Sequence, residues 1–97
     1  MPYIVSTKRA VLDKTISTLH HQLVELELDH ATNNFEGNLN YTITKLLSLC
    51  YSSPSYRELN DVVGVLECIK LEYYRKVGAP YEDNKEFENG PVHNKPQ

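Results

Sequence analysis

Apolar residues recur every three or four positions through three stretches of this chain, and this pattern constrains the fold more than any other feature. Such spacing places apolar side chains on one face of an α-helix. Because the connections are short, the predicted fold class is all-α: a three-helix bundle-like domain with an irregular C-terminal extension. The stripes are Leu12, Ile16, Leu19, Leu23 and Leu26; Leu39, Ile43, Leu46 and Cys50; and Leu59, Val62, Val63, Leu66, Ile69 and Tyr73.

Polar residues ahead of each stripe mark where the helices begin. Ser6 or Thr7 can cap the first helix, and Asn38 can cap the second. Ser55 is followed three residues later by Glu58, which forms a capping box and gives the third helix the clearest start.

Glycine and proline mark the end of the third helix and one point inside it. Gly78 suits a left-handed position after a helix, and Pro80 follows, so we expect the helix to stop there. Gly64 lies in mid-helix, where it costs about 1 kcal/mol relative to alanine. Close approach of another helix is the favoured explanation for Gly64, and a ligand contact is the alternative.

The 97 residues have the length of one domain, which we place at residues 1–92, with a flexible tail at residues 93–97. No apolar run approaches the roughly 20 residues of a membrane-spanning helix. The first five residues do not resemble a signal peptide, so we expect a cytoplasmic protein, in the host cell if a phage encodes it.

Three helices in fewer than 80 residues make a thin core. Self-association would bury more surface, so we expect a homo-oligomer. Cys50 and Cys68 lie at apolar positions of predicted helices, where buried thiols are the favoured interpretation and a disulfide is the alternative.

The formal net charge is −3, which argues against binding to a long nucleic acid, because proteins that bind nucleic acids are usually basic. Charge is nevertheless unevenly distributed. Residues 70–76 carry three cationic side chains and one acid, so a small anionic ligand can still find a positive site.

Motifs for catalysis or metal binding are not evident. His20 and His21 are adjacent, so on a helix they point about 100° apart and cannot easily share a metal. Glu25 and Asp29 are four residues apart, which favours an acidic face exposed to solvent or to a basic surface. The sequence also has no glycine-rich phosphate loop and no activated nucleophile, so we expect neither an enzyme nor a cofactor.

Two segments carry binding potential. In the first, Asn40, Tyr41 and Thr44 surround the expected start of the second helix, where free N–H groups favour anions. Simple capping is the competing interpretation.

The second segment combines tyrosines with cations around the end of the third helix. Tyrosine rings can stack on bases, and lysine and arginine can hold phosphates, so the segment suits a nucleotide or a protein hot spot equally well. Alternatively, Tyr73 and Tyr81 pack inward while Arg75 pairs with a nearby acid. The candidate residues are Lys70, Tyr74, Arg75, Lys76, Tyr81 and Lys85.

These segments resemble an uncharacterised family, a domain of unknown function carried by bacteriophages and some bacteria. The resemblance covers nearly the whole chain and adds Asn89, in an Asn-Gly motif, to the candidate ligand-binding residues. Here Pro91 stands where the family pattern has an acid, and Lys76 stands where it has a second arginine. The motifs are Gly37-Asn38-Leu39-Asn40-Tyr41-Thr42-Ile43-Thr44, Lys70-Leu71-Glu72-Tyr73-Tyr74-Arg75, Ala79-Pro80-Tyr81-Glu82-Asp83-Asn84-Lys85 and Asn89-Gly90.

The resemblance implies a phage context but no activity. Phages encode many compact proteins that block host machinery, and some small oligomers sequester nucleotide signals of bacterial defence. The first hypothesis is therefore a non-enzymatic phage protein that sequesters such a signal at an oligomer interface. The second is a protein–protein interaction module that inhibits a host enzyme or defence protein.

Overall fold

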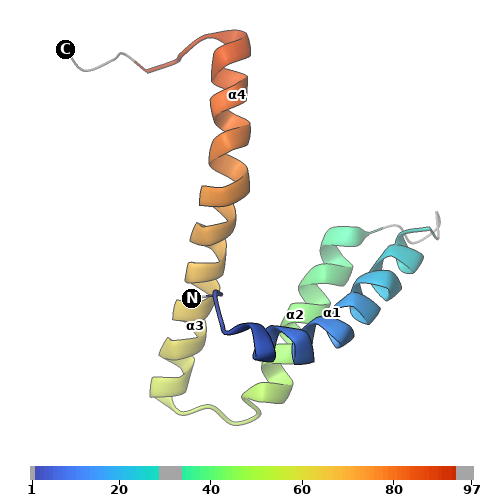
Figure 1. Ribbon diagram of the computed structural model, residues 1–97. Helices are drawn as coiled ribbons and strands as arrows, with labels where there is room; N and C mark the ends of the chain where they lie inside the picture. Colours follow the sequence, from blue (N-terminus) through green and yellow to red (C-terminus); the bar gives the residue numbers. More distant parts are fainter. Residues whose placement is uncertain (1, 29–33, 94–97) are drawn as a thin grey trace. The chain divides into compact units, whose positions relative to one another are not determined.

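The computed structural model describes residues 2–28 and 34–93. Residues 29–33, which precede the predicted start of the second helix near Asn38, and residues 94–97, most of the expected tail, lie outside that part. All regular elements of the described residues are helical, so the all-α fold class is confirmed (Figure 1). They are α1 (Ser6–Glu27), α2 (Phe35–Cys50), α3 (Tyr56–Tyr73), a π-helical turn η1 (Tyr74–Gly78) and α4 (Ala79–Asn89).

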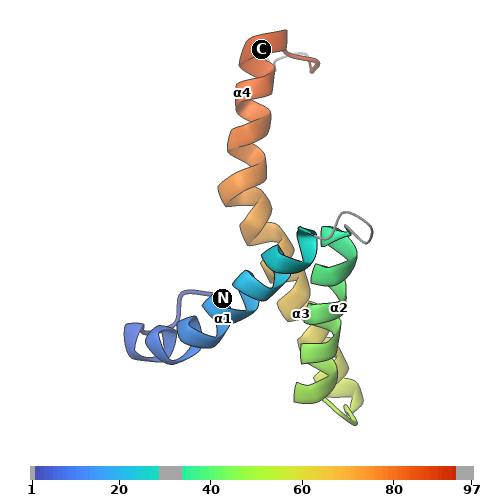
Figure 2. The same ribbon diagram turned by 90° about the vertical axis from the view of Figure 1, so that its right-hand side faces the viewer.

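The chain forms two units, one of residues 2–59 and one from Asn60 onward. In the first unit, α1 and α2 contact each other and approach most closely near the C-terminal end of α1 (Figure 2). In the second, α3, η1 and α4 follow one another as one continuous helix (Figure 1). No helix of the described residues is long and apolar enough to cross a membrane.

Burial is confined to one place in the described structure. Leu23 of α1, at 8 % exposure, is the buried apolar residue of these two ranges, and Leu19 beside it is half-buried. Burying a leucine contributes about 1.5–3 kcal/mol. Ordering the backbone of a single residue already costs about 1–2 kcal/mol. The described helices keep most of their apolar faces exposed within each unit.

The first two helices begin differently from the prediction. α1 starts at Ser6, but Val5 occupies the N-cap position without a side-chain cap, so neither Ser6 nor Thr7 caps it. α2 starts at Phe35 rather than near Asn38, because Asn34 caps it: its Oδ1 accepts from the Gly37 N–H at 3.0 Å. A side chain at residue 37 would collide with Asn34, so Gly37 is what permits this earlier cap.

The capping box at the start of α3 is confirmed. The Glu58 N–H donates to Ser55 Oγ at 3.2 Å, and the Ser55 N–H donates to Glu58 Oε1 at 3.2 Å. Each side chain thus satisfies a backbone donor that the helix itself leaves open.

The predicted helix stop at Gly78 is wrong, and so is the irregular extension after it. Gly78 has right-handed helical angles, φ −68° and ψ −49°, and the chain continues into α4. Pro80 lacks the N–H of a regular α-turn. The wider π turn before it accommodates this, with the Ala79 N–H donating to the Tyr74 carbonyl five residues back. The helix ends instead at Gly90, whose φ of +90° favours glycine.

Three expectations of inward packing are also wrong. Cys50 and Cys68 are exposed free thiols, and Tyr73 is exposed. A Cβ added at Gly64 would meet no described atom within 4 Å, so close helix approach does not explain this glycine within the described residues. For Cys68, Gly64 and Tyr73 the reason is that the apolar face of α3 finds little to pack against inside its own unit.

Replacing Ser55 by alanine tests the capping box. We expect Ser55→Ala to lower the free energy of unfolding by about 1 kcal/mol, because the Glu58 N–H loses its acceptor, Ser55 Oγ. Urea denaturation at fixed protein concentration measures the change. Ser53→Ala, two residues earlier and outside the box, is the matched control; an equal loss in both variants would contradict the assignment.

Candidate functional site

Two surface hollows contain six of the ten candidate residues. The α2 hollow, of about 530 Å³, is lined by Glu36, Gly37, Asn40, Tyr41 and Thr44. The α4 groove has a volume of about 440 Å³. It lies in the unit from Asn60 onward, whereas the α2 hollow lies in the unit of residues 2–59. The groove is lined by Tyr74, Glu82, Asp83, Lys85, Glu86, Asn89, Gly90, Val92 and His93.

The α2 hollow does not hold an anion in the predicted way. Since α2 begins at Phe35, Asn40, Tyr41 and Thr44 lie beyond its first turn and not at its start. At the actual helix start, the Gly37 N–H already donates to Asn34 Oδ1. The hollow instead offers the exposed Tyr41 ring beside the Asn40 amide, whose Oδ1 accepts from Thr44 Oγ1 at 3.1 Å.

Tyr74 is positioned by the glycine that follows one turn later. A Cβ at Gly78 would lie 2.6 Å from Tyr74 Cδ2 and 3.0 Å from its Cε2, so the ring covers the space that Gly78 leaves open. Gly78 thus sets the orientation of Tyr74 at one end of the α4 groove. This packing role replaces the helix-stop role expected from the sequence.

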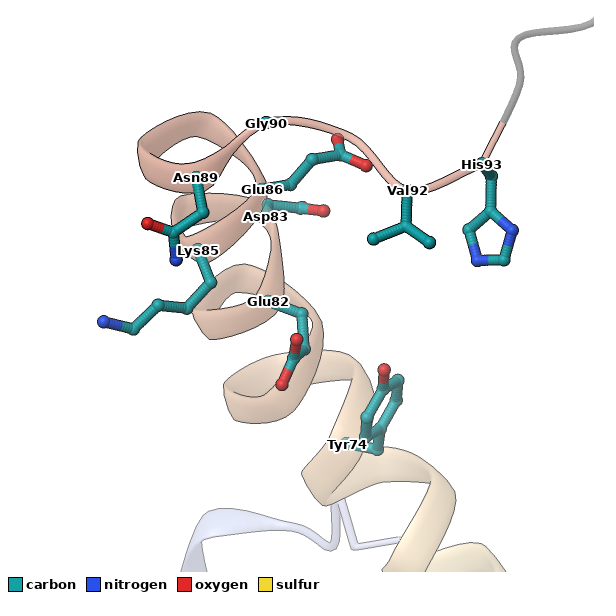
Figure 3. Close-up of a pocket in the computed structure, with 9 residues that line it drawn as sticks. All are labelled: Tyr74, Glu82, Asp83, Lys85, Glu86, Asn89, Gly90, Val92 and His93. Atoms are coloured by element: carbon teal, nitrogen blue, oxygen red, sulfur yellow. The ribbon is translucent and has the colours of Figure 1, made fainter.

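The α4 groove brings together Tyr74, Lys85 and Asn89, but these side chains do not converge. Figure 3 shows Lys85 and Asn89 projecting from one side of α4, while Val92 and His93 follow the turn at Gly90 on the other side. Three acids, Glu82, Asp83 and Glu86, also line the groove. Because they outnumber its lysine, the groove itself favours cationic or neutral groups over phosphate.

The cations of the candidate site lie just before the groove. Lys70 Nζ is 3.4 Å from Glu67 Oε1, with the lysine side chain 73 % exposed. Arg75 Nη2 lies 3.0 Å from both carboxylate oxygens of Glu72, which confirms the expected pairing with a nearby acid. Lys76 follows in η1 and makes no ion pair with the described residues.

Tyr81 and Lys85 form a separate pair on α4. Lys85 Nζ lies 5.7 Å from the centre of the Tyr81 ring, within range of a cation–π contact. The same nitrogen is 3.3 Å from Glu88 Oε2. Tyr81 therefore does not pack inward, and its ring and Lys85 stiffen the exposed face of α4.

His20 and His21 have ring centres 5.8 Å apart. Across the described residues no group of three His, Cys, Asp or Glu side chains could hold a metal ion.

The arrangement of the candidate residues suits binding by stacking and charge. Exposed tyrosine rings beside lysines and an arginine can bind a planar anionic molecule without any covalent step.

Sequence reasoning missed the acids of the α4 groove. Glu82 and Glu86 are four residues apart and share a helix face, but this signal is meaningful only if the segment is helical. The irregular extension predicted there concealed it. Glu36 of the α2 hollow was missed for a similar reason, because α2 was expected to start later.

Comparison with known proteins identifies a family but no activity. The model of a domain of unknown function, DUF6899, matches residues 1–92. This confirms the resemblance to a family of unknown function. No curated protein and no solved structure gives a significant match.

Gly78→Ala tests the link between the π turn and Tyr74. A helical glycine replaced by alanine ordinarily gains up to about 1 kcal/mol. We expect Gly64→Ala to gain this, and Gly78→Ala to gain clearly less because the new Cβ displaces the Tyr74 ring. In a Tyr74→Ala background the two substitutions should become equal in urea denaturation. A full gain from Gly78→Ala alone would contradict the contact.

Proposed function

The chain belongs to the DUF6899 family of unknown function, and we propose from its own residues that it is a non-enzymatic phage protein that binds and sequesters a small nucleotide-derived signal of host defence at an oligomer interface. The observation that carries this proposal is the cluster of exposed tyrosines and cations around η1. Its phage setting rests on the motif resemblance, and its place would be the host cytoplasm.

Tyr74 and Lys70 provide the core of the proposed site. They are four residues apart, so they occupy neighbouring positions on one helix face. The Tyr74 ring can stack on a base, while Lys70 neutralises phosphate one turn away. Arg75 and Lys76 add further positive charge within the next two residues.

The existing ion pairs do not prevent phosphate binding. The Lys70 and Glu67 side chains are 73 % and 55 % exposed, and such an exposed pair contributes only about 0–1 kcal/mol. Lys70 can therefore exchange Glu67 for a phosphate at little cost. Arg75 is 62 % exposed but its partner Glu72 only 24 %, so Arg75 would bind a phosphate while it keeps Glu72.

The acids of the α4 groove determine how a ligand would lie. Glu82, Asp83 and Glu86 repel phosphate, so the base would occupy the groove beside Tyr74 and the phosphates would face residues 70–76. Asn89 can hydrogen-bond a base edge with its amide. One helix face cannot enclose a ligand, which is why the proposal places the site where chains meet.

Thermal unfolding with a nucleotide panel tests this function. The panel comprises cyclic dinucleotides, cyclic trinucleotides and ADP-ribose derivatives. A bound member should stabilise the protein by about 2.7 kcal/mol at about a hundredfold excess over Kd. Tyr74→Leu and Arg75→Gln should each reduce this response, because they remove the stacking ring and the planar cation.

The matched controls come from the start of the same helix. Tyr56→Leu and Arg57→Gln replace exposed residues outside the candidate site and should leave the response intact. A flat response of the wild-type protein across the whole panel would overturn the proposed function.

The second candidate is a protein–protein interaction module that inhibits a host enzyme or defence protein. Two exposed apolar residues favour this candidate. Phe87, in the last turn of α4, is 91 % exposed, and Val92, in the segment after α4, is 90 % exposed. Exposed aromatic residues often anchor interfaces. The acids beside them would suit a basic partner surface.

Phe87→Ser tests this candidate. If Phe87 is an anchor, immobilised wild-type protein retains a host protein under mild salt and Phe87→Ser loses it, since the aromatic contact area is gone. Val11→Ser, at an exposed apolar position of α1, should retain it. Equal retention by both variants, or none by the wild type, contradicts this candidate.

A further inference from the structure

We infer that the continuous helix from Tyr56 to Asn89 pairs with the same helix of a second copy of this chain, antiparallel and crossing near residue 79. The basic segment of each copy, Lys70–Lys76, then lies beside the acidic segment, Glu82–Glu88, of the other. This inference rests on the proposed function only where it assigns a ligand to the paired site; the pairing itself needs no ligand.

An apolar stripe crosses the π turn and supplies the contact. Ile69, Tyr73, Val77 and Tyr81 follow one another at spacings of four. In a regular α-helix each such step advances about 40° around the axis, so these four residues would not stay on one face of the helix. The π turn holds more residues per turn, which keeps Val77 and Tyr81 near the face of Tyr73. Tyr73, Val77 and Tyr81 are 66, 48 and 58 % exposed.

Charge sets the direction of pairing. The basic segment carries three cations and one acid, and the acidic segment carries four acids and one lysine. A parallel pair in register would place like segments together, which is repulsive. An antiparallel pair about a two-fold axis near residue 79 places each basic segment against an acidic one, twice over by symmetry.

The same axis matches the apolar residues. Val77 of one copy comes opposite Tyr81 of the other, on both sides of the axis, and Tyr73 comes opposite Lys85. Lysine over a tyrosine ring is a contact that this helix already makes between Lys85 and Tyr81. The pairing therefore repeats an interaction that suits these side chains.

Charge and area favour a second copy as the occupant. The stripe from Ile69 to Tyr81 is about 18 Å long at about 1.5 Å per residue. The basic segment overlaps its first part and the acidic segment follows it, so an antiparallel second copy supplies the opposite charge at both ends. A fully accessible tyrosine exposes about 150–250 Å², and Tyr73 and Tyr81 are 66 and 58 % exposed. Together with Ile69 and Val77, the stripe therefore offers on the order of 400 Å² per copy. A stable interface needs roughly 800 Å² per partner, which the charged flanks would complete.

Pairing would also complete the proposed ligand site. The basic segment of the second copy would lie beside the α4 groove of the first and offset Glu82, Asp83 and Glu86. A ligand with its base on Tyr74 of one copy could then place its phosphates on cations from the other. The groove of a single copy lacks that positive charge.

Sedimentation equilibrium of the full chain without ligand tests the pairing. We expect a concentration-dependent dimer or larger assembly for the wild type. Val77→Glu should weaken association by roughly tenfold or more, because a carboxylate would be buried without a partner. Val11→Glu, on α1, is the control that should associate normally, and circular dichroism confirms that each variant remains helical. A wild-type monomer at all concentrations, or unchanged association of Val77→Glu, would overturn the inference.

Disulfide trapping tests the direction in a Cys50→Ser, Cys68→Ser background. Chains with Tyr73→Cys and chains with Lys85→Cys, mixed and oxidised, should form the mixed disulfide. Tyr73→Cys chains alone should not cross-link, because antiparallel pairing separates the two thiols far beyond the reach of about 7 Å between Cα atoms. Efficient cross-linking of Tyr73→Cys alone would indicate parallel pairing and contradict the inference. If the protein associates without ligand but no nucleotide of the panel raises its thermal stability, the proposed function is rejected and the pairing is not.

Discussion

Unpartnered apolar helix faces are the constraint on which the rest of this structure depends. Stripes long enough for a core run along α1, α2 and α3, yet within the described units only Leu23 of α1 is buried. Burial of one leucine contributes little against the conformational entropy of ordering these helices. The exposed faces are therefore available for contacts, and we seek the function where exposed apolar and charged side chains coincide.

Exposed apolar and charged side chains lie together around the π turn at Tyr74–Gly78. The turn allows Pro80 to lie in a helix that continues to Asn89, and it places the Tyr74 ring over Gly78. It also joins a segment rich in cations to one rich in acids along one rod. A single helix cannot bring those two segments face to face, and the pairing that we infer sets each of them against the opposite segment of a second copy.

Binding rather than catalysis is the chemistry that these residues suit best. The exposed tyrosines offer stacking surfaces, and Lys70 holds an exposed ion pair that a phosphate can replace. The acids of the α4 groove limit where that phosphate can lie. A site shared between two copies reconciles the acidic groove with an anionic ligand, because each copy would supply the charge that the other lacks.

Local signals in the sequence determined the helical class and the capping box of Ser55 and Glu58, since each depends on residues only a few positions apart. The same signals failed at Gly37 and Gly78. Gly37 was expected ahead of the second helix and Gly78 at the end of the third, but both lie in helices, where they make room for Asn34 and Tyr74. The acids of the α4 groove became visible only once residues 79–89 proved helical. Whether a glycine ends a helix or accommodates a neighbouring side chain depends on the space around it, and only the three-dimensional structure decides that.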